Sequence, residues 1–338
     1  MTPLGRTQPG DASPPPGAKW FAAFAPEAPG LDAARALLSE RRARYHRLLE
    51  QAADDPTGKR IRKLRVATRR LDAAYRFASP LLASGQAKRR RAALRLVRQA
   101  GGRVRRCDLF LERLSRIAEA EGGSSVGAAT SAVIGRLAAV RHEAMAELLA
   151  LLRDPARAGL TDDRERSHAE PLTSRELARR SLREAGDRFL AKAGAPTLET
   201  EPLHDLRLAG KKLRYAVEVA APVTGDEAAG DLIRAVVPLQ NELGTINDLA
   251  ELADELSATI ARLAAVGPGA AQLAAGAERL FLASAAERDR RLTAYARSGR
   301  DQIDSVRSVF AAALKACDQP EPAAPPLRLT DLDSLGTA

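Results

Sequence analysis

The chain has 338 residues and a formal net charge of +10, because 53 Lys and Arg outnumber 43 Asp and Glu. Hydrophobic residues make up 45% and charged residues 28%, a balance that excludes an extensively disordered chain. The basic excess suggests an acidic partner, although the Arg- and Ala-rich composition of a GC-rich genome also explains it. Only Cys107 and Cys317 are present, without a CxxC pair, so neither a disulfide framework nor a zinc site is expected.

The two ends of the chain differ in composition from the region between them. Residues 1–30 are rich in Pro, Gly and Ala and lack periodicity, which predicts a disordered arm. Residues 1–16 show no apolar segment typical of a signal peptide, and no apolar run in the chain approaches the roughly 20 residues of a membrane span. Residues 317–338 are rich in proline and predict a disordered tail. We therefore expect a cytoplasmic protein that does not bind membranes.

Between the ends, apolar residues recur with the period of an α-helix and show no strand-like alternation. The sequence therefore predicts an all-α fold. It divides into a first helical half at 31–160, a polar linker at 161–172 and a second helical half at 173–316. Short signals mark helix boundaries: two helix starts with proline in the first turn, one glycine-rich turn and one break. These are, in order, Asp54-Asp55-Pro56, Thr200-Glu201-Pro202, Glu121 to Ser125 and Gly267-Pro268-Gly269.

An internal repeat relates the two halves. The segment Leu64 to Leu71 resembles Leu206 to Leu213 at an offset of 142 residues (206 − 64). The same offset aligns Gly102 with Gly244 without a gap. Such a constant offset indicates two similar helical units.

Basic residues form a stripe beside the apolar face of one helix in each half. At 100° per residue, the first stripe contains Arg62, Arg65 and Arg69, and the second contains His204, Arg207, Lys211 and Arg214. Arg70 and Lys212 lie on the opposite flanks of these helices, and Arg98 and Arg105 belong to a further basic run. A solvated basic face would explain one such stripe, but two stripes at the same register favour an anion-binding surface. Guanidinium groups match phosphate oxygens in a bidentate manner.

These residues resemble the CHAD domain (conserved histidine α-helical domain). The family carries a His-x-x-Arg-x-x-x-(Arg/Lys)-(Arg/Lys)-Leu-Arg helix once in each half. The segment from His204 to Arg214 is similar to the second copy of this helix, and the segment from Arg65 to Leu71 is similar to the first copy. The trailing segments of the family resemble Gly102 to Asp108 and Leu243 to Asp248. The resemblance covers about residues 31–316.

This resemblance implies two antiparallel four-helix bundles related by a pseudo-twofold axis. It also implies that inorganic polyphosphate binds in a basic groove or pore between the bundles, and that the protein associates with polyphosphate granules. Two departures stand out: Arg62 replaces the first signature histidine, and Asp72 replaces the arginine after Leu71. Arg62 keeps the positive charge, so the resemblance still implies anion binding.

Recognisable catalytic motifs are missing, and the sequence therefore predicts a binding protein without cofactor or metal rather than an enzyme. The four histidines are isolated, and no phosphate-binding glycine loop is present. The segment from Asn247 to Glu255 is rich in acidic residues and could hold a metal, but its pattern fits a solvated helix face better. Two other functions stay open. One is nucleic-acid binding, against which the scarcity of aromatic residues argues; the other is an enzyme acting on phosphoanhydrides through Asp248. The sequence leaves the oligomeric state open.

Overall fold

The computed structural model describes residues 18–83, 85–121, 123–159, 171–194 and 198–319. Throughout these ranges the regular secondary structure is helical and no strand occurs, which confirms the all-α prediction. The helices in chain order are α1 (Gly30–Asp54), α2 (Gly58–Ala78), α3 (Gln86–Ala120), α4 (Ser125–Leu152), α5 (Ser174–Ala193), α6 (Thr200–Thr224), α7 (Asp226–Val266) and α8 (Ala271–Cys317). Two short 3-10 turns, Ala18–Trp20 and Pro268–Ala270, complete the set.

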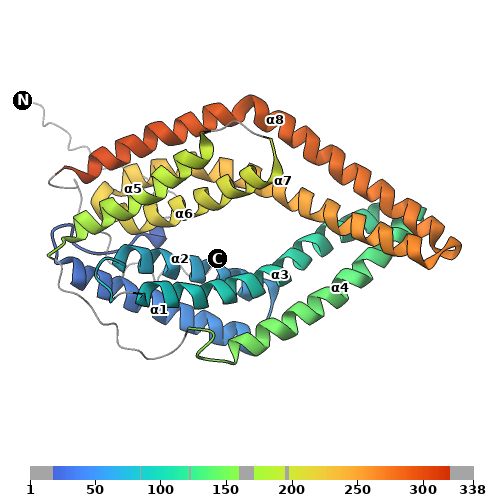
Figure 1. Ribbon diagram of the computed structural model, residues 1–338, viewed down its shortest axis with the longest axis horizontal. Helices are drawn as coiled ribbons and strands as arrows, with labels where there is room; N and C mark the ends of the chain where they lie inside the picture. The colour runs from blue at the N-terminus through green and yellow to red at the C-terminus, as the bar shows by residue number, and fades with distance from the viewer. Residues whose placement is uncertain (1–17, 84, 122, 160–170, 195–197, 320–338) are drawn as a thin grey trace, which may run out of the picture.

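Each helix packs against its neighbour in the chain, from α1 to α4 and again from α5 to α8. Figure 1 shows the first group along one side of the molecule and the second group along the other. The groups contact each other mainly through α2 with α6 and through α4 with α8. The basic stripes of α2 and α6 therefore lie on one of the helix pairs that join the halves.

Two hydrophobic cores stabilise this arrangement. The larger core takes buried residues from both groups of helices. The smaller core lies where the far ends of α3, α4, α7 and α8 meet, so it also draws on both halves (Figure 1). Its buried members are Phe110, Leu114, Val133, Leu137, Leu252, Leu256 and Leu280. Burial of these apolar side chains holds the two halves together at that end.

The helix bounds agree with the sequence offset of 142. Shifting α2 by 142 gives residues 200–220, and α6 spans 200–224. Shifting α3 gives 228–262, which lies within α7. The pseudo-twofold relation between the two groups stays a prediction.

Most helix boundaries agree with the sequence signals, with one correction. The start of α2 is set by Thr57, whose hydroxyl accepts the backbone N–H of Arg60 at 3.3 Å, and not by the Asp54-Asp55-Pro56 segment. Thr173 caps α5 in a capping box with Glu176. The breaks at 121–124 and at Gly267 are confirmed.

The structure corrects the prediction of a disordered arm over residues 1–30. Residues 18–29 pack against the helices, and the ring of Trp20 lies between two guanidinium groups. The centroid of the ring is 4.2 Å from Cζ of Arg44 and 3.6 Å from Cζ of Arg70. Phe24 also stacks on Phe77, and the backbone N–H of Ala22 donates to the carbonyl of Glu218 at 2.8 Å. These contacts follow no helical period, which explains why the sequence pattern missed them. Residues 1–17, most of the predicted linker and residues 320–338 lie outside the described parts of the chain.

Candidate anion-binding site

Six predicted site residues from three helices come together. We call them the basic cluster: Arg65 and Arg69 on α2, Arg98 and Arg105 on α3, and Arg207 and Lys211 on α6. Each is close enough to another member for the positive charges to repel. The cluster therefore joins the two basic stripes and part of the third basic run that the sequence indicated.

Arg65 is a central member of the basic cluster. Its pKa falls to about 10, first because the side chain is largely buried and then because four other cations of the cluster surround it. Its Nε is buried and has no hydrogen-bond partner. Arg207 resembles it, because burial likewise lowers its pKa and its Nε also lacks a partner. Both guanidinium groups are thus held in place without full use of their hydrogen-bonding capacity.

Lys211 shows the largest electrostatic effect in the cluster. Its pKa falls to about 6, because burial disfavours the ammonium and because Arg207, Arg69 and Arg65 repel it. Asp248 opposes this effect but does not cancel it. A bound anion would favour the charged form of Lys211.

Two carboxylates lie at the edges of the basic cluster. Asp248 on α7 has an oxygen 3.6 Å from Nη2 of Arg207. Asp72 on α2 accepts hydrogen bonds from Arg76 at 2.9 Å and from Arg91 at 3.0 Å. Burial alone would raise the pKa of Asp72, but these two guanidinium groups outweigh it and lower the pKa. Because Asp72 pairs with Arg76 and Arg91, which lie outside the basic cluster, the six cations of the cluster keep a large excess of positive charge.

His204 lies next to the cluster in a fixed orientation. Its Nδ1 is 2.5 Å from Oδ1 of Asn247, whose amide donates to Glu251 at 3.0 Å. Since the amide nitrogen faces Glu251, the oxygen faces the histidine, and Nδ1 must carry the proton. Glu251 in turn pairs with Arg106 of α3 at 2.8 Å. The sequence analysis missed this chain of contacts, although the i,i+4 spacing of Asn247 and Glu251 was a signal for it.

The acidic residues of α7 are used in ion pairs between helices. Glu251 pairs with Arg106, and Glu255 pairs with Arg136 of α4. Across the described ranges, His, Cys, Asp and Glu side chains do not gather in groups of three or more that could hold a metal ion. Salt bridges between helices therefore explain why these acidic residues gather on α7.

Arg70 and Arg214, two predicted site residues, serve the internal structure instead. Arg70 is 6% exposed and forms a bidentate pair with Glu218, with Nε 2.7 Å from Oε2 and Nη2 3.2 Å from Oε1. Nε of Arg214 lies 3.8 Å from the same carboxylate. A wheel of one helix gives the direction of a side chain but not its neighbour, and here Glu218 of α6 faces α2. We therefore remove both arginines from the candidate site.

The remaining two predicted residues are exposed. Arg62 lies near the start of α2, ahead of the basic cluster in the chain. Lys212 lies near Arg76, Arg91 and Arg188, and burial followed by repulsion from these cations lowers its pKa. These two positions extend the positive charge beyond the basic cluster but do not form its centre.

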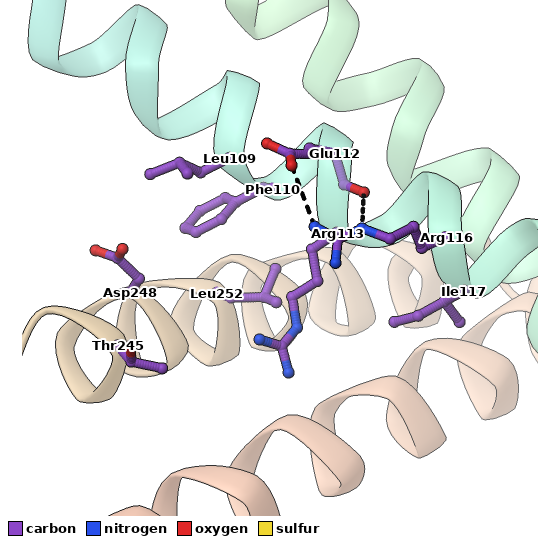
Figure 2. Close-up of a pocket in the computed structure, with 9 residues that line it drawn as sticks. All are labelled: Leu109, Phe110, Glu112, Arg113, Arg116, Ile117, Thr245, Asp248 and Leu252. Atoms are coloured by element: carbon purple, nitrogen blue, oxygen red, sulfur yellow. Dashed lines mark hydrogen bonds and ion pairs between the residues drawn. The ribbon is translucent and has the colours of Figure 1, made fainter. Parts of the chain in front are cut away.

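A cavity of about 480 Å³ lies farther along α3 and α7. Figure 2 shows Asp248 reaching toward α3, while Arg113 extends from α3 past α7. Four apolar side chains line it beside these polar groups: Leu109, Phe110, Ile117 and Leu252. Its mixed lining is unlike the dense positive charge of the basic cluster, so we place the candidate anion site at the cluster.

None of the described helices combines the length and the apolar character that spanning a lipid bilayer requires. The family model of the CHAD domain matches residues 36–257. A search of curated proteins returned no match.

Two solved structures are similar in fold. The crystal structure of the CHAD domain from the plant Ricinus communis shares 19% identity at a TM-score of 0.56, covering 86% of this chain and 96% of that one. PptA from Streptomyces chartreusis shares 18% identity at a TM-score of 0.58, covering 85% of this chain and all of that one. At these identities the likeness supports the fold alone.

Proposed function

Because this chain belongs to the CHAD domain family, we propose that it binds inorganic polyphosphate through the basic cluster between its two helical groups. The observation that carries this proposal is the convergence of six cations from α2, α3 and α6. A polyphosphate chain places a negative charge on every unit, so one ligand can contact all six cations. Association with polyphosphate granules is part of the same proposal.

The electrostatics of the basic cluster favour such a ligand. Burial and mutual repulsion oppose the charged forms of Arg65, Arg207 and Lys211. A polyanion removes the repulsion and supplies acceptors for the guanidinium groups. A hydrogen bond to a charged partner contributes about 1.5–3 kcal/mol, so a few such contacts suffice for tight binding.

The proposal is tested by replacing Arg65, Arg69, Arg207 and Lys211 together with alanine. We expect the affinity for long-chain polyphosphate to fall at least a hundredfold, measured by calorimetric titration. A matched control replaces four exposed arginines on other surfaces, Arg183, Arg262, Arg297 and Arg300, and removes the same number of charges. If both variants lose affinity equally, overall charge and not the basic cluster determines binding.

Competition distinguishes polyphosphate from a nucleic-acid backbone. Aromatic side chains near the cluster are used for packing: Tyr215 is buried and Trp20 is covered by two guanidinium groups. Stacking platforms for single-stranded bases are therefore not available from these residues. We expect DNA and RNA to displace polyphosphate only at a large excess of phosphate. Displacement at comparable phosphate concentration would favour nucleic-acid binding instead.

We also propose that binding occurs without catalysis. The basic cluster consists of five arginines and one lysine, and none of these six residues is a hydroxyl or thiol nucleophile paired with a base. Incubation of the protein with polyphosphate and magnesium should release no phosphate above the rate of the protein-free control. Turnover that disappears in an Asp248→Asn variant would show that the protein is an enzyme.

A further inference from the structure

Two glycines lie directly beneath two arginines of the basic cluster, Arg65 and Arg207. A Cβ atom added to Gly102 on α3 would lie 3.7 Å from Nη2 of Arg65. A Cβ atom added to Gly244 on α7 would lie 3.6 Å from Nε of Arg207. In each case every heavy atom within 4 Å belongs to that one arginine. Each guanidinium group therefore lies against a part of a helix surface that carries no side chain.

The same arrangement occurs in both halves of the molecule. Arg65 and Arg207 are 142 residues apart, and so are Gly102 and Gly244. Both arginines are members of the basic cluster, and in both the Nε atom is buried without a hydrogen-bond partner. Each guanidinium group therefore lies over a glycine, and its buried Nε has no hydrogen-bond partner that would orient it.

Glycine in the middle of a helix destabilises it relative to alanine. Gly102 lies well inside α3 and Gly244 well inside α7, far from any turn. Neither has a positive φ, so backbone conformation does not require glycine at these positions. At both sites the atoms nearest to an added Cβ belong to the arginine, and the neighbouring Gly101 also faces Arg65, with an added Cβ 3.2 Å from its Cγ.

We propose that Gly102 and Gly244 are positioning residues for anion binding, because each leaves the helix surface free where the guanidinium group of Arg65 or Arg207 lies. A flat, fixed guanidinium group presents its terminal nitrogens to a phosphate with little conformational entropy left to lose. This inference rests on the proposed polyphosphate function. It holds that two uncharged residues, Gly102 and Gly244, determine where the two guanidinium groups lie.

The test is a size series at each glycine. Alanine makes only ordinary contact and should change the affinity for long-chain polyphosphate less than threefold. Valine has two further carbons that must displace the guanidinium group, so Gly102→Val or Gly244→Val should weaken binding roughly tenfold, about the loss of one charge-assisted contact. Gly135→Val is the matched control, because Gly135 lies on α4 with no atom within 4 Å of the added Cβ.

A double-mutant cycle separates positioning from general structural damage. In an Arg207→Ala background, Gly244→Val should cause no further loss of affinity, since the residue it acts through is gone. A tenfold loss that persists in this background would overturn the inference. So would unchanged affinity of both valine variants while the four-residue alanine variant loses binding. If the wild-type protein itself fails to bind polyphosphate, the proposed function is wrong.

Discussion

At the residue scale, Lys211 links the charge of the basic cluster to pH. Its ammonium is surrounded by Arg65, Arg69 and Arg207, with Asp248 as the counter-charge, and its pKa is lowered to about 6. Above pH 6 the free protein therefore holds Lys211 largely neutral. A bound polyanion raises this pKa, so binding takes up a proton.

The affinity for polyphosphate should consequently fall as the pH rises from 6 to 8, by at most tenfold per pH unit. Calorimetric titrations at several pH values measure this, with long chains so that terminal phosphates contribute little. In Lys211→Arg the guanidinium group stays charged, so the pH dependence should flatten. An equally steep dependence in Lys211→Arg would exclude Lys211 as its source.

Arg70 and Glu218 form the ion pair that joins α2 to α6 in the interior. Removing one partner of a buried pair leaves the other charge uncompensated and typically costs about 3–5 kcal/mol. Glu218→Gln should lower the free energy of unfolding by roughly this amount in denaturant titrations. Glu184→Gln is the control, because its partner Arg180 is exposed and such pairs contribute about 0–1 kcal/mol. Equal losses in the two variants would contradict a structural role for Arg70.

At the element scale, close approach of helices fixes how the two halves meet. Gly276 of α8 lies so near α4 that an added Cβ would be 2.4 Å from the carbonyl oxygen of Ser125 and 2.5 Å from Cβ of Ala129. Neither a backbone oxygen nor a packed methyl group can move aside easily. Glycine therefore permits the α4–α8 contact that closes the far end of the molecule (Figure 1).

Gly276→Val should accordingly destabilise the fold by at least about 1–3 kcal/mol, the usual cost of overpacking. Thermal unfolding measures this, and Gly135→Val serves again as the control on an open surface of α4. Hydrogen exchange should speed up first at the far ends of α4 and α8. Unchanged stability of Gly276→Val would mean that α4 and α8 are farther apart than described.

The sequence predicted the helices and the basic stripes because both depend on spacing within one element. Leu64 and Leu71 mark an apolar face of the helix, and Arg65 and Arg69 mark a basic face. Both faces can be recognised without knowing which helix lies opposite. The pattern placed Arg69 in the basic stripe and Arg70 on the opposite flank, but it could not show that Arg70 pairs with Glu218 instead of joining the site. That distinction depends on the neighbouring helix. A pattern of charges likewise gave no role to Gly102.

At the scale of the whole molecule, the basic cluster gains its charge from both halves. The first half supplies Arg65, Arg69, Arg98 and Arg105, and the second supplies Arg207 and Lys211. The carboxylate Asp248 and the oriented His204 belong to the second half, so the site is unequal on its two sides. The contacts of α2 with α6 hold these contributions together.

The dependence of polyphosphate affinity on salt tests the basic cluster most directly, because it counts the phosphates that cations neutralise. Taking about −0.7 per neutralised phosphate, as for single strands, six cations give a slope of log affinity against log salt of roughly −4. We predict this slope for the wild-type protein and a slope smaller in magnitude by roughly 1.4 for a variant lacking Arg65 and Arg207. A slope near zero in the wild type, or the same slope in both proteins, would contradict binding at the basic cluster.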